Sequence, residues 1–472
     1  MTIWLDERIR FDNWPQVSVY NMPSVFQIDS GYLSIDKCYE ALRQIVAHQW
    51  IFRTRLVFDF ECGCLNQVID ENQCICPIRV STYTDDTQKI ALLSEELNKP
   101  FNTEQDGFFR CHLIRQHHDH SDDNVLTVGD LIIFHFHHGS FDGRAADLFL
   151  DEFKRAYAGT QLQSPSLQYI DYSIHERALP MIEAKNYWQT VLQNYDVNRQ
   201  LYLGTMSTNL SVLHRTGKGS SLNIIIPSKI AHSMITFTRQ FNVTLFQLGL
   251  ACYYLFLVEL SSQNADACIG VIHLNRYRPE LTSMIGMFAN ILPCRISIDS
   301  LQTLCFVELV YKIQKIFLEN VEHAHFPYYQ LLNLHQMPRS HLQFPFIQTV
   351  FRVDTSTVDY NNANSLVLDS SCRLSTYKLH QPNDIYKFDL ELSFNYNQVS
   401  DTIECEWNYA LDFFEMKTIE MHANRFIDLL TQLFDSHSPE KLQMPLDKIM
   451  SIDKEQKSTI VKCINHQVRN LF

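Results

Sequence analysis

The feature that most constrains the fold is a short apolar run that ends at two histidines and is followed by an Asp-Gly pair. Residues 131–136 are mostly β-branched or aromatic, which is typical of a buried strand, and the histidines are His137 and His138. From Gly143 onward, apolar residues recur at helical spacing until Gly159, which supplies a helix stop. The segment therefore predicts a strand, a tight turn and an amphipathic helix.

The turn between this strand and helix brings a titratable side chain close to backbone amides. Side chains alternate along a strand, so His137 and His138 point to opposite faces and only one of them can face a given cavity. His138 stands at the strand end, and the first-turn amides of the following helix lie nearby as possible oxyanion donors. A base next to an anion site is the arrangement expected of an acyl-transfer centre.

The spacing of His137, His138, Asp142 and Gly143 resembles the core motif of the condensation domains of nonribosomal peptide synthetases. This family belongs to the wider chloramphenicol-acetyltransferase-like superfamily. Further segments resemble the family's conserved blocks and follow the family's order across roughly residues 3–465. They are residues 3–11, 48–55, 168–172, 275–281, 286–295, 323–332, 345–351 and 388–392. The first block lacks the polar residues that usually precede it in the family.

The resemblance implies an α/β (α+β) fold of two chloramphenicol-acetyltransferase-like lobes, arranged as a V-shaped pseudo-dimer with a central substrate tunnel. We expect residues 1–175 to form the N-terminal lobe, which carries the histidine motif, and residues 176–472 to form the C-terminal lobe. Within the latter we expect a floor loop at about 281–295 and a latch at about 385–410. A length of 472 residues agrees with two lobes, because it exceeds what one hydrophobic core usually organises.

The resemblance also implies an activity. The family joins a donor acyl or peptidyl thioester to the α-amine of an acceptor aminoacyl thioester, each carried on the 4'-phosphopantetheine of a carrier protein. We therefore expect a peptide-bond-forming acyltransferase with no cofactor of its own, with donor and acceptor peptidyl carrier proteins as partners and an adenylation domain as neighbour. Two alternatives stay open: a freestanding acyltransferase that uses a soluble amine or alcohol, and a catalytically silent platform that binds carrier proteins.

Three motif residues have expected roles at the site. His138 is expected to orient the acceptor amine and to take a proton as the tetrahedral species forms or collapses. The amide of Gly143 is a candidate donor to the oxyanion. His137 points away from His138, so we expect it to be structural. The alternative for each histidine is a satisfied core residue, which is the commoner fate of a histidine beside an apolar run.

Four more residues follow from the family pattern. The resemblance of the second block implies that an arginine on a strand, Arg53 by position, forms a buried ion pair with Asp142. Such a pair holds the carboxylate ionised and lowers its basicity, so Asp142 is expected to be a structural clamp and not a second base. The pattern makes Asn290 and Arg295 candidates for the substrate tunnel, with turn and surface roles as their alternatives.

Composition excludes several partners. A net charge of −14 argues against nucleic acid and anionic membranes. No apolar run approaches the ~18 residues of a membrane helix, and no secretory signal is visible, so we expect a cytoplasmic protein. We also expect the protein to be monomeric. Thirteen scattered cysteines favour reduced thiols.

Two clusters resemble metal sites without matching one well. Cys62 and Cys64, with Cys74 and Cys76, have Cys-x-Cys spacing, whereas zinc sites usually prefer two to four intervening residues. The histidine-rich segment 116–120 is typical of a solvated hairpin loop. We expect no functional metal site.

Overall fold

The computed structural model describes most of the chain. The described residues are 2–11, 19–61, 63–70, 78–105, 107–117, 124–197, 215–261, 265–299, 303–337, 345–356, 365–369, 372–377, 384–435 and 442–449. Among the residues discussed above, Cys62, Cys74 and Cys76 lie outside this set, as do residues 118–120 of the histidine-rich segment.

The chain divides into two compact units, and each is built from several segments. Unit 1 comprises Met1–Pro180, Leu274–Ala289 and Tyr360–Gln381, and unit 2 comprises Met181–His273, Asn290–Asp359 and Pro382–Phe472. The expected division into residues 1–175 and 176–472 therefore needs a correction, because two later segments belong with the first unit. The expected floor loop at about 281–295 is likewise split, since its last residues begin a strand of unit 2.

Unit 1 is built on a six-stranded sheet in the order β13-β14-β1-β8-β6-β5. The strands are β1 (Asn21–Gly31), β5 (Ile78–Tyr83), β6 (Phe109–Gln116), β8 (Leu131–His137), β13 (Ser365–Asp369) and β14 (Cys372–Thr376). Neighbours are antiparallel except for the parallel pair β5 and β6. Strand β8 is the strand predicted for the histidine motif, and every residue in it is buried.

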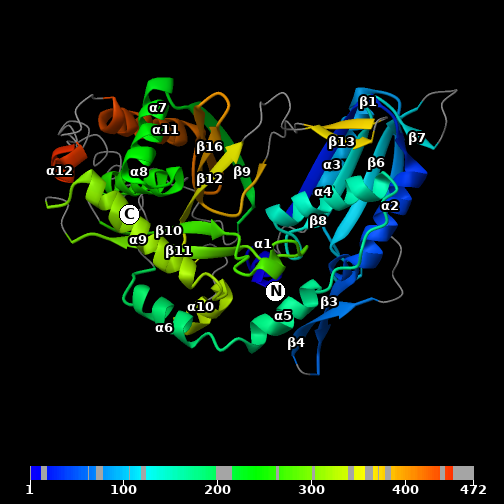
Figure 1. Cartoon of the computed structure of the whole chain (residues 1–472), viewed down its shortest axis with the longest axis horizontal. Coiled ribbons are helices and arrows are strands. Elements are labelled where there is room, and N and C mark those ends of the chain that lie inside the picture. Colours follow the sequence, from blue (N-terminus) through cyan, green and yellow to red (C-terminus); the bar gives the residue numbers. More distant parts are fainter. Residues whose placement is uncertain are drawn as a thin grey trace, which may run out of the picture. The chain divides into compact units, whose positions relative to one another are not determined.

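Unit 1 contains helices that pack against both faces of this sheet and helices that pack elsewhere. They are α1 (Thr2–Phe11), α2 (Ile35–His48), α3 (Asp86–Asn98), α4 (Gly143–Tyr157) and α5 (Tyr169–Ala178), with short 3₁₀ turns η1 (Trp50–Arg53) and η2 (Pro279–Leu281). Helices α2 and α4 share one apolar core with the sheet, and Figure 1 shows both helices beside its strands. Helix α3 packs on a second core, which contains Leu131 and Ile133 from the other face of β8.

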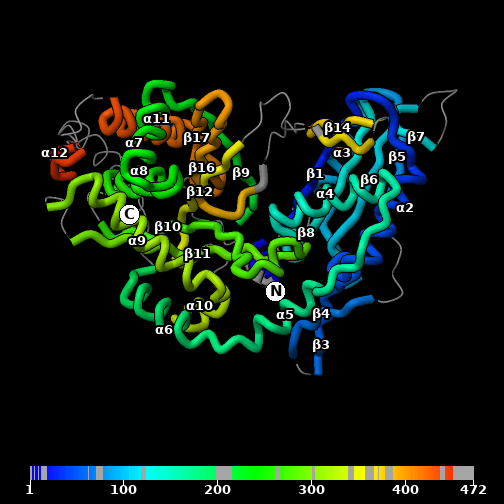
Figure 2. The backbone as a smooth tube through the Cα atoms, in the orientation of Figure 1, coloured from blue at the N-terminus to red at the C-terminus, as the bar shows by residue number. Residues whose placement is uncertain are grey.

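Two small sheets and one long-range pairing complete unit 1. The small sheets pair β2 (Leu33–Ser34) with β7 (Val125–Leu126) and β3 (Thr54–Asp59) with β4 (Cys64–Ile69). In Figure 2 the late strand β14 lies beside the early strand β1, with which it pairs. Unit 1 thus combines strands from opposite ends of the sequence.

Helix α4 begins and ends where the sequence predicts. It starts at Gly143, directly after the motif, and Asp142 caps its N-terminus. Gly159 adopts a φ of 84°, in the left-handed region that glycine occupies without strain, and its N–H donates to the carbonyl oxygen of Ala156. The predicted strand, turn and helix are therefore confirmed.

Unit 2 is built on a seven-stranded sheet in the order β11-β10-β12-β16-β17-β9-β15. Its strands are β9 (Lys218–Ile225), β10 (Asp266–His273), β11 (Asn290–Ser297), β12 (Thr349–Ser356), β15 (Asp384–Ile385), β16 (Leu390–Asn397) and β17 (Thr402–Ala410). Most of the segment at about 385–410, expected to be a latch, forms β16 and β17 inside this sheet. The strands from the later part of the sequence that join the sheet of unit 1 are β13 and β14 instead.

The helices of unit 2 are α6 (Ile182–Val191), α7 (Ser228–Phe241), α8 (Leu245–Leu260), α9 (Phe306–Glu322), α10 (Tyr328–Leu334), α11 (Met416–Phe434) and α12 (Leu446–Ile449). Helix α8 is apolar all round and almost fully buried, as expected of a central core helix. No single helix in the described ranges is long and apolar enough to cross a membrane; only the bent pair α7 and α8, taken together, meets that test of length and composition.

Candidate active site

His138 follows directly after β8, at the start of the turn that leads into α4. It is half-buried, and its backbone N–H donates to the carbonyl oxygen of Tyr20 over 2.8 Å. Its ring Nδ1 lies 2.8 Å from the carbonyl oxygen of Phe141. Because a carbonyl oxygen only accepts hydrogen bonds, Nδ1 carries the proton and Nε2 is the basic nitrogen of the neutral ring.

His137 has the opposite tautomer. Its Nδ1 accepts the N–H of Gly139 over 3.0 Å, so its proton lies on Nε2, which is 2.9 Å from a carboxylate oxygen of Glu7. The ring is buried and lies on the other face of β8 from His138. The rings of the two adjacent histidines therefore have different hydrogen-bond partners.

The turn itself is anchored by aromatic packing. Phe141 is fully buried, and its ring stacks on that of Phe136 at a centroid distance of 3.8 Å and an interplanar angle of 4°. The N–H of Ser140 also donates to the carbonyl oxygen of His137 over 3.1 Å. These contacts fix the carbonyl of Phe141 and, through it, the ring of His138.

Asp142 lies at the end of the turn and is completely buried. One carboxylate oxygen accepts the N–H of Ala145, which caps α4, and the other accepts the N–H of Phe288 over 3.0 Å. The guanidinium of Arg276 donates to both oxygens at 3.0 and 3.2 Å. The same guanidinium lies over the ring of Phe288 at 4.3 Å and donates to the carbonyl oxygen of Met284.

Gly143 is the first residue of α4, and its surroundings leave its backbone accessible. A Cβ atom built on Gly143 would meet no atom within 4 Å. The N–H of Ala145 donates to the carboxylate of Asp142, and the N–H of Ala146 donates to the backbone carbonyl oxygen of Asp142. Gly143 is thus exposed at the N-terminus of α4, where the first N–H groups of a helix have no partner within the helix.

A family model described as "Condensation domain" matches residues 11–460. The chain belongs to the condensation domain family. It is 24% identical over 451 residues to surfactin synthase subunit 2 of Bacillus subtilis (strain 168), an alignment that covers 95% of this chain and 12% of that protein. It is 21% identical over 449 residues to tyrocidine synthase 2 of Brevibacillus parabrevis, with 92% of this chain and 11% of that protein covered. The chain thus spans only about an eighth of the length of these relatives.

Solved structures share the fold. The X-domain from teicoplanin biosynthesis has a TM-score of 0.76 at 19% identity, with 92% of this chain and 93% of that chain covered. The first condensation domain of the calcium-dependent antibiotic synthetase, in complex with a substrate analogue, has a TM-score of 0.66 at 14% identity, with 96% of each chain covered. The expected α/β fold is confirmed by this likeness.

The pairing expected between Arg53 and Asp142 is wrong. Arg53 lies at the end of the turn η1, one residue before β3, and its guanidinium donates to the carbonyl oxygens of Val46, Ala47 and Asp70 at 3.1 to 3.3 Å. The first two carbonyls belong to the last turn of α2, where no intrahelical donor is left. Arg53 therefore caps α2, and Arg276 is the partner of Asp142.

Arg276 lies within a segment that resembles a family block, but no local pattern indicates its role. It lies 134 residues from Asp142 along the chain. Neither periodicity nor local spacing can connect residues so far apart. The one signal in the sequence is that this block holds two arginines just before a proline turn, at Arg276 and Arg278.

Asn290 and Arg295, expected in the substrate tunnel, make structural contacts in unit 2. Asn290 donates to the carbonyl oxygens of Ala324 and Phe326 at 2.9 and 2.8 Å, which fixes the connection between α9 and α10. Arg295 forms a two-pronged ion pair with Asp266 at 2.9 Å, between neighbouring strands. These contacts correspond to the structural alternative for both residues.

The described residues include no group of three or more histidine, cysteine or acidic side chains placed to hold a metal ion. Cys64 is disulfide-bonded, whereas the other described cysteines are free. The preference for reduced thiols over a disulfide framework holds for the other described cysteines but not for Cys64.

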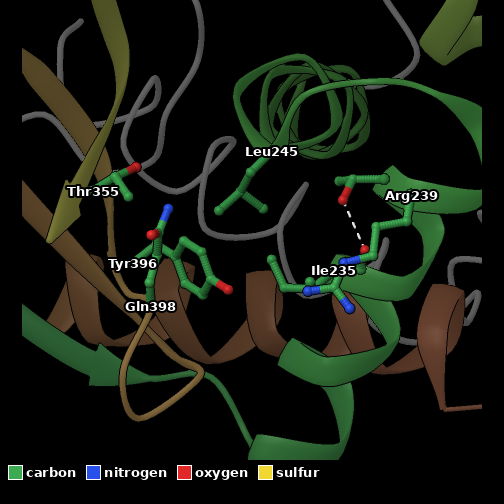
Figure 3. A pocket seen from close by; sticks show the side chains of 7 residues that line it. Ile235, Arg239, Leu245, Thr355, Tyr396 and Gln398 are labelled. Atoms are coloured by element: carbon green, nitrogen blue, oxygen red, sulfur yellow. Dashed lines mark hydrogen bonds between the residues drawn. The ribbon is translucent and has the colours of Figure 1, made fainter. Parts of the chain in front are cut away.

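A pocket of about 470 Å³ lies in unit 2 (Figure 3). It is lined by Ile235, Thr238, Arg239, Leu245, Thr355, Tyr396 and Gln398. The hydroxyl of Thr238 donates to the carbonyl oxygen of Ile235 beside it. None of the candidate site residues lines this pocket, so the histidine motif takes no part in it.

Proposed function

We propose that this condensation domain forms an amide bond between a donor acyl or peptidyl thioester and the α-amine of an acceptor aminoacyl thioester. Both substrates are delivered on the 4'-phosphopantetheine of carrier proteins, and the domain itself binds no cofactor. The observation that carries the proposal is the state of His138, whose Nδ1–H is held by the Phe141 carbonyl so that Nε2 is the basic nitrogen.

The acceptor amine needs only modest activation. An ordinary α-amino group has a pKa of about 7.7–8.0, and a neighbouring thioester withdraws electrons and lowers it further, so much of the amine is neutral at pH 7. As the amine nitrogen attacks the thioester carbonyl, the nitrogen becomes positively charged and the carbonyl oxygen negatively charged. Nε2 of His138 takes the proton from nitrogen.

The second half of the reaction releases the donor carrier. The carbon–sulfur bond breaks, the oxyanion returns to a carbonyl, and the thiolate of the donor arm receives the proton held by His138. The amide of Gly143, an exposed residue, stabilises the oxyanion before this collapse. Asp142 keeps its clamping role, because its oxygens already accept from Ala145, Phe288 and Arg276.

One comparison favours a second candidate function, a platform that binds partner proteins without condensing substrates. A structure titled "Complex of the X-domain and OxyB from Teicoplanin Biosynthesis" has a TM-score of 0.77 to this chain at 19% identity and covers 96% of it. A protein with this fold is thus found in a complex with another protein.

The test uses the purified chain with loaded donor and acceptor carrier proteins, and in parallel the same acyl groups on coenzyme A with a soluble amine. Intact-protein mass spectrometry follows the mass of the acceptor carrier. Condensation between carriers alone supports the proposal, whereas equal rates with the small molecules would favour a freestanding acyltransferase. Carrier binding without any product would favour the platform.

A further inference from the structure

Helix α1 carries two adjacent acidic residues that reach two different neighbours of His138. Glu7 lies 2.9 Å from Nε2 of His137, the residue before His138. Asp6 accepts a hydrogen bond of 2.5 Å from the hydroxyl of Tyr20, whose backbone carbonyl oxygen accepts the N–H of His138. The segment that matches the first family block incompletely thus forms a helix that contacts the motif at His137.

The contact with Glu7 determines whether the other ring nitrogen of His137, Nδ1, donates or accepts a hydrogen bond. A neutral imidazole has one N–H and one accepting nitrogen, so a carboxylate that accepts from Nε2 keeps Nδ1 as the acceptor. That Nδ1 accepts the N–H of Gly139. A Cβ on Gly139 would lie 2.9 Å from the same Nδ1, so only glycine allows so close an approach.

Gly139 opens the turn that holds the ring of His138. The turn runs from Gly139 to Phe141, and the Phe141 carbonyl oxygen accepts the Nδ1–H of His138. A series of hydrogen bonds, with one short turn between them, therefore links Glu7 to Nδ1 of His138, the ring nitrogen that carries the proton. The links are Glu7 to His137, His137 to Gly139, and Phe141 to His138.

We infer that Glu7 is a positioning residue for condensation, acting through His137 and the Gly139 turn on His138. This inference rests on the proposed function for its effect on rate, but its structural part concerns the histidine tautomers alone. The side chain of Glu7 is 22% exposed, whereas that of His137 is buried. The effect of Glu7 is on geometry, where displacements of about 1 Å cost up to about 100-fold in rate.

Helix α1 has a second contact outside the helix besides that of Glu7. Arg10 is buried and donates to both oxygens of Asp6 at 2.7 and 2.6 Å, and Asp6 also accepts from Tyr20. Burial raises the pKa of Tyr20 well above its usual value, and the charge of Asp6 raises it further, so the hydroxyl remains a donor. A Glu7 variant therefore removes the contact with His137, while the contact of Asp6 with Tyr20 remains.

The test compares Glu7→Ala, Glu7→Gln and the charge control Arg8→Gln, an exposed position on the same helix. With loaded carrier proteins, we expect Glu7→Ala to lower kcat by about 10- to 100-fold with little change in KM. Glu7→Gln should recover most of the rate, because its amide oxygen still accepts from Nε2, and Arg8→Gln should match the wild type. If Glu7→Ala fails to fold, Glu7→Asp, which keeps the charge but is one methylene shorter, replaces it.

A second measurement needs no substrate. In protein with ¹⁵N-labelled histidine, NMR of the wild type should show His137 as the Nε2–H tautomer and His138 as the Nδ1–H tautomer, with the signals identified by their loss in single variants. In Glu7→Ala both patterns should change. Unchanged histidine signals or a full kcat in Glu7→Ala would overturn the inference, whereas a wild type that forms no product but shows these tautomers would count only against the proposed function.

Discussion

Asp142 connects three parts of unit 1 through one buried carboxylate. It caps α4, accepts the amide of Phe288 and pairs with Arg276, whose side chain is 5% exposed. A buried charge is costly unless it is paired and hydrogen-bonded, so each partner depends on the other. The same donors occupy the oxygens that a second catalytic base would need.

Removal of either charge should therefore destabilise unit 1. We expect Asp142→Ala and Arg276→Ala each to lower the free energy of unfolding by about 3–5 kcal/mol, and the double variant to lose less than the sum. Combining Asp142→Ala with Arg53→Ala should be additive to within about 0.5 kcal/mol, because Arg53 caps α2 and shares no partner with Asp142. Urea unfolding of the single and double variants measures the coupling energy of each pair. A larger coupling with Arg53 than with Arg276 would contradict the assignment.

At Gly143, the effect of a substitution on stability can be measured separately from its effect on amide formation. Its added Cβ would meet open space, so Gly143→Ala should fold normally and gain up to about 1 kcal/mol from helix propensity. The new methyl group would occupy the approach to the amides, so we expect amide formation to fall. Thermal unfolding and the carrier assay check the two effects. Full activity in this variant would exclude the Gly143 amide from the reaction.

At the scale of elements, local sequence patterns predict helices and strands well, but they do not predict contacts between residues that are distant in the sequence. The strand, turn and helix around His138 follow from periodicity and from Gly159, which are local signals. The prediction for Arg53 is wrong because the turn η1 stands between α2 and β3 and directs its side chain to the end of α2. Strand β14 pairs with β1, near the other end of the sequence, and no local pattern records such a pairing.

The face of β8 opposite His138 carries a buried polar cluster. Glu96 of α3 lies 2.5 Å from Arg110 and 3.2 Å from each of His112 and His135. Burial alone would raise the pKa of Glu96, but hydrogen bonds from the two histidines and the charge of Arg110 outweigh it, and the pKa lies below its usual range. Burial lowers the pKa of His135.

This cluster should make stability fall in acid. His135 resists protonation in the folded state, so stability begins to fall as the pH drops below its ordinary pKa of 6.5. The ionised Glu96 stabilises the folded state above its ordinary pKa of 4.5, and that contribution is lost as the pH falls toward its lower folded-state value. We expect Glu96→Gln to be less stable near neutrality and to lose less on acidification below 4.5. Urea unfolding across this range is the measurement, and an unchanged acid slope would contradict the role of Glu96.

At the scale of the whole molecule, each unit depends on segments that are far apart in the sequence. Residues 1–180 lack Arg276, the partner of Asp142, and they lack β14, which pairs with β1. The core of unit 1 also contains Ile285, Leu368 and Leu374 from the later segments. The first 180 residues are therefore an incomplete folding unit.

We expect residues 1–180, produced alone, to be aggregated or to lack a cooperative unfolding transition. Strand β1 would become an exposed edge, and the charge of Asp142 would be buried without its partner. Circular dichroism and size-exclusion chromatography, with the full chain as control, make the comparison. A soluble fragment that unfolds cooperatively would show that the later segments are dispensable.

The central claim is that His138 performs the proton transfer of amide formation. The most direct measurement is the carrier-to-carrier condensation rate of His138→Ala beside the wild type, with thermal unfolding of both. Because His138 is half-buried at a strand end, we predict no detectable amide product and a stability within about 1 kcal/mol of the wild type. Condensation at the wild-type rate by a folded His138→Ala protein would contradict the account.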